Sequence, residues 1–148
     1  MKRKLEYRLN DPSQGYPAIY HFDDLEPLQI FCRRNCDFFI LEGTVYETTS
    51  SFLKDSSFVI YVKKSDDEKP FRQAEAERRL GVEVRLYKEY AESPEIMFLP
   101  CFDHVEVFSY LDNTYLVLEG KEYERVSAEM DQDRLMYVLY VRETGERV

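Results

Sequence analysis

Residues 41–47 read LEGTVYE and residues 118–124 read LEGKEYE, so nearly the same seven residues occur twice, 77 positions apart. The similarity extends outward from both stretches. Residues 5–50 and 82–127 align without gaps and share twelve identities in 46 positions, whereas unrelated segments would share about three. Glycine and proline positions are among the identities. The sequence therefore predicts an internal duplication, with the Glu-Gly stretch as its best-preserved part.

Each copy predicts the same series of elements. Two short strands come first, followed by a helical segment. An apolar strand, Glu-Gly and an alternating strand come next, which predicts a β-hairpin whose glycine (Gly43 or Gly120) adopts a positive φ. A last strand closes each copy, and FVIYVK (58–63) matches YVLYVR (137–142) after two extra residues in the second copy. The predicted order is therefore ββαβββ in each copy.

Residues 24–35, DLEPLQIFCRRN, carry the helix signals of the first copy. Asp24 is expected to cap the N-terminus, and Asn35 is expected to end the helix in the left-handed conformation. Helical spacing predicts one buried face, made of Leu25, Leu28, Phe31 and Cys32. The corresponding face of the second copy would be Phe102, Val105 and Phe108. We expect residues 100–112 to form a helix. A strand stays possible there, because β-branched residues lower the helix propensity.

The copies are joined by SDDEKPFRQAEAERRLG, residues 65–81, which predicts a connecting helix with Pro70 near its start and Gly81 as its stop. The predicted fold class is α+β and β-rich. Two tandem units, residues 1–64 and 82–148, are expected to pack with pseudo-two-fold symmetry into one compact domain. A unit of about 65 residues buries only a modest share of its surface alone, so the two apolar faces are expected to cover each other.

The composition excludes several classes of function. The net charge of −9 and the lack of long basic runs argue against a nucleic-acid binder and against a membrane-surface protein. The basic start is not followed by an apolar segment, so we expect no secretory signal and a cytoplasmic location. Five scattered glycines exclude phosphate-binding loops, and the common hydrolase and metalloprotease motifs are absent. No cofactor is predicted, and no catalytic residue can be named.

Three cysteines are an odd number and do not predict a disulfide framework, so buried, reduced thiols are expected. One set of residues nevertheless has the chemistry of a zinc site. It consists of Cys32, Cys36, Cys101 and His104. The pairs lie in corresponding regions of the two copies, so packing of the copies would bring them together, although the Cys-x-x-x-Cys spacing is looser than in most zinc sites. Of the two alternatives, the sequence favours the absence of a metal site over a zinc site.

The leading functional interpretation is a non-catalytic protein–protein interaction or regulatory module, acting as a monomer or a homodimer. A second interpretation is an enzyme with its site at the junction of the repeats, where duplication would bring paired residues together. A third is an acidic decoy that occupies the groove of a nucleic-acid-binding protein. The repeated carboxylates Glu42 and Glu119 are expected to be solvated in their turns and not to be catalytic.

Overall fold

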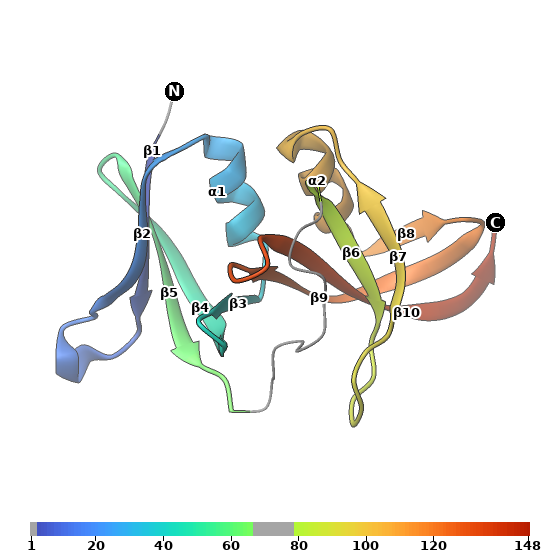
Figure 1. The fold of residues 1–148 in the computed structure, drawn as a ribbon, viewed down its shortest axis with the longest axis horizontal. Coiled ribbons are helices and arrows are strands. Elements are labelled where there is room, and N and C mark those ends of the chain that lie inside the picture. The colour runs from blue at the N-terminus through green and yellow to red at the C-terminus, as the bar shows by residue number, and fades with distance from the viewer. Residues whose placement is uncertain (1–2, 67–78) are drawn as a thin grey trace.

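The computed structural model describes residues 3–66 and 79–148. Within these residues ten strands form one mixed sheet accompanied by two α-helices (Figure 1). The protein is therefore α+β and β-rich, as predicted. Most of the connecting helix predicted over residues 65–81 lies outside the described residues.

The described elements fall into a first and a second half of the chain. The first half contains β1 (Arg3–Leu9), a 3₁₀ turn (Pro12–Gln14), β2 (Ala18–Leu25), α1 (Pro27–Arg34), β3 (Phe38–Leu41), β4 (Thr44–Lys54) and β5 (Ser57–Lys64). The second half contains β6 (Gly81–Leu86), β7 (Glu95–Pro100), α2 (His104–Leu111), β8 (Tyr115–Leu118), β9 (Lys121–Asp131) and β10 (Met136–Arg147). The order β-β-α-β-β-β, predicted from the sequence, is present in both halves.

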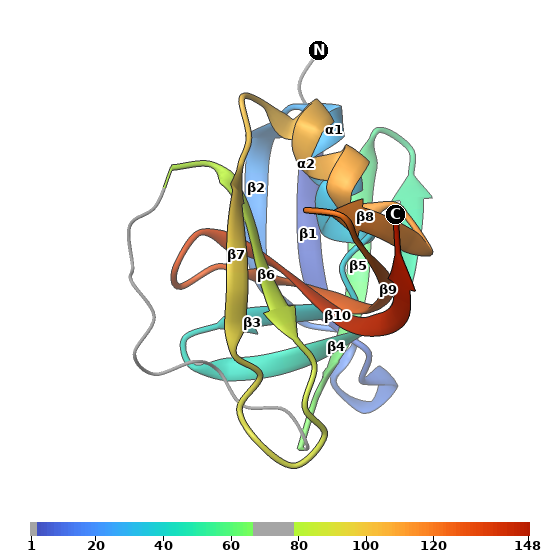
Figure 2. The same cartoon turned by 90° about the vertical axis from the view of Figure 1, so that its right-hand side faces the viewer.

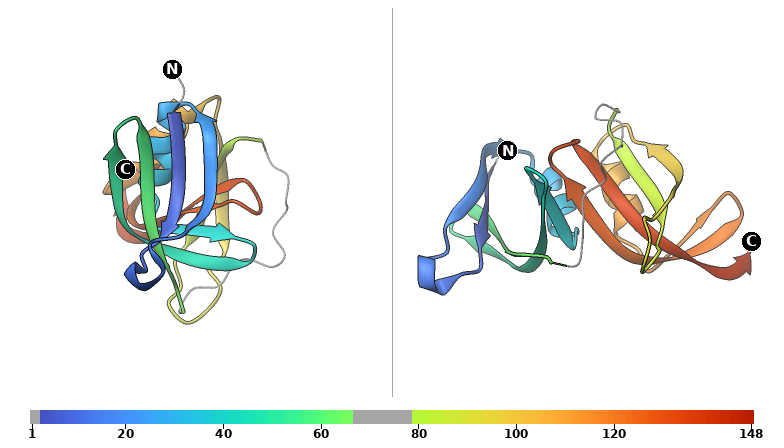
Figure 3. Two further views of the ribbon diagram at one scale, coloured as in Figure 1. Left: turned by 90° about the vertical axis from the view of Figure 1, so that its left-hand side faces the viewer. Right: turned by 60° about the horizontal axis from the view of Figure 1, so that its bottom comes forward.

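The strands pair in the order β2-β1-β5-β4-β3-β9-β10-β6-β7, and β8 pairs with β9 at the side of this path. Within each half the first strand runs parallel to the last one, β1 to β5 and β6 to β10. The strand order is thus β2-β1-β5-β4-β3 in the first half and β7-β6-β10-β9-β8 in the second (Figure 3). A parallel pairing of β3 with β9 joins the halves into one sheet.

The two Glu-Gly stretches form matching two-residue turns. The φ angles are 50° at Glu42 and 74° at Gly43, and 51° at Glu119 and 78° at Gly120. Two successive positive φ values define the type I′ turn, whose twist suits a tight hairpin. The predicted hairpins and the positive φ of both glycines are confirmed. Both glutamates also adopt the left-handed region, which the sequence did not indicate, and both are exposed as expected.

Helix α1 begins later than predicted and buries different residues. Asp24 belongs to β2, Pro27 is the first helical residue, and Asn35 ends the helix with a right-handed φ of −76°. The buried residues are Ile30, Cys32 and Arg33, whereas Phe31 is largely exposed. The predicted face was therefore only partly right: Cys32 is buried and Leu25 packs partly buried against the core, but Phe31 is 39% exposed. The reason is that α1 lies between the two halves next to α2, as Figure 2 shows, so it packs toward the second half as well as its own sheet.

Residues 104–111 are helical, which settles the choice left open for this segment. Helix α2 begins after Asp103, whose side chain caps the helix by accepting from the Glu106 N–H at 3.1 Å. This start places Val107 and Leu111 on the buried face. Of the predicted face only Phe108 packs against the core, because Phe102 precedes the helix and is exposed and Val105 is exposed as well.

Gly81 is the first residue of β6 and not the stop of a helix. An added Cβ at this position would lie 2.5 Å from the Leu99 carbonyl oxygen and 2.5 Å from the Phe98 ring. The glycine therefore allows β7 to approach β6 closely, which is a tertiary requirement that the sequence pattern did not indicate.

One cluster of buried apolar side chains includes residues of both halves, such as Leu5, Ile60, Val84 and Leu139. A second and smaller cluster lies on the opposite face of the sheet in the second half, where Met136, Val138 and Tyr140 are buried. The sheet of the second half is therefore covered on both faces around β10.

Candidate functional site

The junction of the halves is the first place to look for a site. Phe38, Phe39 and Ile40 of β3 pair in parallel with residues 129–131 of β9. The loop between β9 and β10, which contains the two extra residues of the second half, folds over the tip of the first hairpin. There the two Asp133 carboxylate oxygens accept from the Glu42 N–H at 2.7 Å and from the Gly43 N–H at 2.8 Å. The extra loop length thus clamps the first Glu-Gly turn.

Arg33 of α1 is the central polar residue of the junction. Its side chain is 94% buried, since its exposed fraction is 6%. It donates to the Gln132 Oε1 atom at 2.8 Å and to the Tyr7 hydroxyl at 3.4 Å, and its guanidinium lies 4.4 Å from the centre of the Phe22 ring. Its Nε atom has no hydrogen-bond partner, and no carboxylate of the described residues forms an ion pair with it. Arg33 therefore links α1 to the β9–β10 loop as a buried cation that no described carboxylate neutralises.

The aromatic residues around Arg33 are tightly packed. The Tyr7 ring stacks on Phe39 with 3.7 Å between ring centres. Burial raises the pKa of Tyr7 to about 12, and burial also raises the pKa of Tyr137 well above its ordinary value. Both hydroxyls therefore stay protonated at neutral pH and do not act as bases or as counter-ions for Arg33.

The structure brings the zinc candidates only partly together. The Cys32 Sγ donates to the backbone oxygen of His104 at 3.5 Å, and the Cys36 Sγ donates to the backbone oxygen of Cys32 at 3.4 Å. The Cys101 Sγ bonds to the Leu99 oxygen at 3.4 Å. Among the described residues, no group of three or more His, Cys, Asp or Glu side chains is arranged to hold a metal ion.

The protonation of these candidates also differs from that of metal ligands. Burial raises the pKa of the Cys32 thiol to about 12 and of the Cys101 thiol to about 11, and it raises the pKa of Cys36 as well. Zinc binds thiolates, so thiols of this kind bind it poorly as they stand. Burial, with a smaller contribution from Arg33, lowers the pKa of His104, whose ring contacts the Tyr137 ring edge-on at 5.8 Å.

A second polar group lies on the outer face of the second half, which is the face of the sheet that carries the smaller apolar cluster around Met136, Val138 and Tyr140. Glu83 accepts from Arg85 and from Arg134, the latter at 2.9 Å, and Arg134 also donates to Asp131 at 2.8 Å. All four residues are buried. Burial raises the pKa of Glu83, but the hydrogen bonds and charge interactions with Arg134 and Arg85 together lower it by more. The net shift of the pKa is therefore downward. This network is a fully paired structural unit, because each charge faces an opposite charge.

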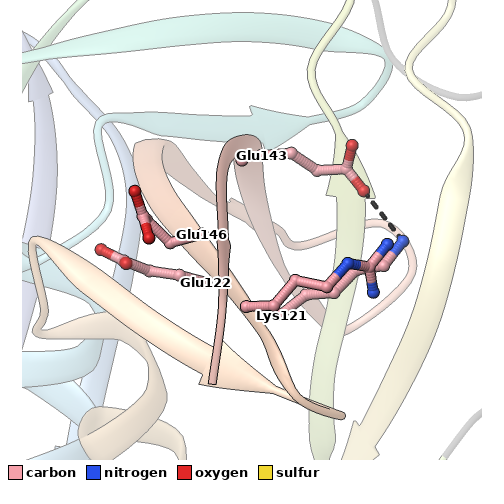
Figure 4. A pocket seen from close by; sticks show the side chains of 6 residues that line it. Lys121, Glu122, Glu143 and Glu146 are labelled. Atoms are coloured by element: carbon pink, nitrogen blue, oxygen red, sulfur yellow. Dashed lines mark hydrogen bonds and ion pairs between the residues drawn. The ribbon is translucent and has the colours of Figure 1, made fainter.

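A shallow hollow of about 60 Å³ lies between the ends of β9 and β10. Figure 4 shows Lys121 and Glu143 paired across part of it, at 3.2 Å, while the carboxylates of Glu122 and Glu146 point away from this pair. Sites for small molecules commonly measure about 300–1,000 Å³, so this hollow holds at most a few waters.

The remaining unusual feature is a set of exposed apolar side chains on two strand segments. Tyr115 and Val117 of β8 are 54% and 52% exposed, and Phe52 and Leu53 near the end of β4 are 54% and 61% exposed. On one side β8 pairs with β9 and the end of β4 pairs with β5. On the other side neither segment pairs with any strand that the structure describes. Apolar residues on an unpaired strand edge are typical of strand-addition interfaces.

Sequence reasoning missed Arg33, Arg134 and the two edges as places of interest. Arg33 and Arg34 read as the basic end of a helix, and only packing distinguishes the buried arginine from its neighbour. Glu83 and Arg85 were visible as repeated positions, yet no sequence signal indicated that they are buried. No sequence signal indicated the edges either, because YLVL (115–118) has none of the charged residues that usually protect an exposed edge.

Comparisons with known proteins add no relative: no family model, no curated protein and no solved structure matches the chain. Within the described part of the chain, no helix is long and apolar enough to cross a membrane.

Proposed function

We propose that the protein is a non-catalytic protein–protein interaction module that binds through unpaired strand edges. The observation that carries this proposal is the exposure of Tyr115, Val117, Phe52 and Leu53 on segments whose outer edge has no described partner. An added strand would satisfy the free backbone groups and cover these side chains, which together supply affinity and specificity.

The module is, in this proposal, a duplicated ββαβββ unit. Support comes from the repeated order of elements, from the repeated strand order and from the two type I′ Glu-Gly turns. Pseudo-two-fold symmetry has narrower support. The Asn35 Nδ2 donates to the Asp112 Oδ1 at 3.1 Å, and these residues occupy matching positions of the two units, as contacts across a two-fold axis do. In a fully symmetric arrangement the pairing of β3 with β9 would be matched by a pairing of β8 with β4. The described strands contain no such pairing, so the symmetry would be confined to the helices.

Packing at the junction favours this proposal over an enzyme with its site there. The junction is filled by side chains that contact each other. Arg33 bonds to Tyr7 and Gln132, and Tyr7 stacks on Phe39. Arg33, Tyr7 and Phe39 are buried. The thiols at the junction are kept protonated by burial. The acidic-decoy interpretation and the cytoplasmic location stay predictions from the sequence.

The test is capture of binding proteins from native lysate by the wild-type chain and by an edge variant, Tyr115→Lys. A protein bound by the wild type and lost from the variant would support the proposal. Tyr90→Lys is the matched control, because Tyr90 is almost fully exposed and lies in the loop between β6 and β7. Equal capture by all three proteins would contradict edge binding. Turnover on a substrate panel, abolished by a change at Arg33 or His104 in a folded variant, would favour the enzyme instead.

A further inference from the structure

The two unpaired edges correspond to the two edges that join the halves. In the β4–β5 hairpin the paired residues next to the turn are Lys54 and Ser57, and in the β9–β10 hairpin they are Asp131 and Met136. The offset of 77 that aligns the halves therefore holds to the end of the strand, where Lys54 matches Asp131. The extra length of the second half lies wholly in its loop, residues 132–135 instead of 55–56.

By the same offset β8 matches β3, and the end of β4 matches the end of β9. The pair β3 and β9 is joined, with Phe38 opposite Glu129 and Ile40 opposite Asp131. The residues of this joined pair of strands are mostly buried, and residues 128–131 are all buried. The matching residues 51–54 are all exposed. The chain thus contains one interface twice, once formed internally and once left open as two separated edges.

The backbone of β8 is oriented for such a pairing. In a hairpin with a two-residue turn, the residues flanking the turn bond to each other, and bonded pairs alternate along the strands. Leu118 and Leu116 therefore bond to β9, while the amides of Val117 and Tyr115 point outward. In β3 the residue that matches Val117 is Ile40, whose carbonyl accepts from the Gln132 N–H across the junction at 2.9 Å.

We propose that β8 of one molecule pairs in parallel with the end of β4 of a second copy of this chain. The register copied from the internal junction places Tyr115 beside Phe52, Leu116 beside Leu53 and Val117 beside Lys54. The pairing would cover two exposed aromatic rings on one face and extend the core with Leu53 on the other. This inference rests on the proposed function, because it names the partner of the same edges.

The assembly would be head-to-tail. Strand β8 and the β4–β5 hairpin lie at opposite ends of the long axis of the molecule (Figure 1), so the contact leads from one molecule to the next. A heterologous contact of this type produces a ring if the rotation closes and a filament if it does not.

The intermolecular contact is expected to be weaker than the internal one. The junction contains a carboxylate, Asp37, that accepts from the Ala128 N–H at 2.9 Å and from Arg125 at 3.1 Å. Thr114 occupies the matching position of the second half and cannot replace it. The short β4–β5 turn likewise has no loop that could clamp a hairpin tip as Asp133 does. Association is therefore expected only at high concentration, about 10 µM to 1 mM.

Sedimentation velocity of the full chain across this concentration range tests the proposal. The mean mass of the wild type should rise from 17.8 kDa to at least about twofold that value. Val117→Lys and Leu53→Lys should each remain monomeric, because each removes one of the two edges. Tyr90→Lys should behave like the wild type. Circular dichroism of each variant checks that it is folded.

Mixing the two edge variants makes the test specific. Val117→Lys keeps an intact β4 edge and Leu53→Lys keeps an intact β8 edge, so their mixture should form dimers and stop there. A wild type that stays monomeric throughout would overturn the proposal, and so would association of Leu53→Lys alone, which indicates pairing of β8 with itself. If the wild type is monomeric but Tyr115-dependent capture of another protein succeeds, self-association fails while the proposed function stands.

Discussion

The same Glu-x-Arg pair occurs at matching positions of the two halves and has two different environments. In the first half Arg8 contacts Glu6 at 2.7 Å, and both side chains are about one-third exposed, 33% and 32%. In the second half the matching Arg85 and Glu83 side chains are 10% and 1% exposed. Glu83 also binds Arg134, which comes from the longer β9–β10 loop. The same Glu-x-Arg pair is therefore solvated in one half and part of a buried network in the other.

The difference follows from the loop between β9 and β10. The β9–β10 loop, residues 132–135, is two residues longer than its counterpart and supplies Arg134 to the outer face and Gln132 and Asp133 to the junction. The first half, with its two-residue turn, has neither. The predictions below separate the energetic consequences of this loop from those of the shared fold.

The largest effect is expected for Glu83→Gln. The change leaves Arg85 and Arg134 buried with one fewer negative charge, which costs about 3–5 kcal/mol of unfolding free energy. The matched change in the first half, Glu6→Gln, should cost less than about 1 kcal/mol because water already solvates that pair. Urea unfolding followed by circular dichroism measures both, since the chain contains no tryptophan. Equal costs would show that burial does not separate the pairs.

The pH dependence of stability sharpens the same comparison. The pKa of Glu83 is lower in the folded protein than in the unfolded chain, so its contribution to stability is complete above the unfolded value, about 4.3. The contribution is lost as the pH falls from there through the folded value. Between pH 6 and pH 3 the wild type should therefore lose more stability than Glu83→Gln does. Parallel curves for the two proteins would contradict the expectation.

A moderate effect is expected at the clamp on the first Glu-Gly turn. Asp133→Asn keeps one acceptor oxygen and loses the charge, so one of its two hydrogen bonds to the turn is lost, at about 1–2 kcal/mol. Asp55→Asn in the shorter turn of the first half is the control, because asparagine tolerates the φ of 59° found there. It should change stability by less than about 0.5 kcal/mol. Amide hydrogen exchange at Glu42 and Gly43 should accelerate in Asp133→Asn only.

The smallest effect concerns the thiols of the two halves. Burial raises the pKa of Cys101 to about 11 and of Cys32 to about 12, so both react slowly with a thiol reagent at pH 8. Cys101 should react first, and unfolding in urea should expose all three cysteines at once. These raised pKa values stabilise the fold fully below the unfolded pKa of about 8.5, and this stabilisation is lost as the pH rises toward 11–12. Rapid reaction of Cys32 in the folded protein would contradict the burial of α1.

Much of the fold could be predicted from the sequence. The last strand of the first copy was expected to include residues 58–63 and occupies Ser57–Lys64, and the two hairpins, the ββαβββ order and the class were also predicted. These features depend on local signals: alternation along a strand, β-branched residues and glycine in a turn. The candidate site was poorly predicted. The cysteines and His104 were selected for their chemistry, whereas Arg33 and the unpaired edges are distinguished only by burial or exposure.

The errors share one physical cause. The faces of α1 and α2, the burial of Arg33 and the role of Gly81 all depend on residues that pack against them from distant parts of the chain. For Arg33 the partner is Gln132, and for Gly81 it is the carbonyl of Leu99. A pattern along one segment reports how its own side chains alternate, and it contains no information about what covers them.

The sequence by itself determined most of the described elements, their order and the positive φ of the glycines in the two Glu-Gly turns, because backbone preferences and periodicity act over a few residues. Only the tertiary structure decided which copy of each repeated feature is buried. Glu83 is fully buried and Glu6 is about one-third exposed, and among the described strands β3 is paired on both edges while β8 is paired on one. The reason is that desolvation and strand pairing depend on what lies on the other side of the residue, and that neighbour differs between matching positions of the two halves.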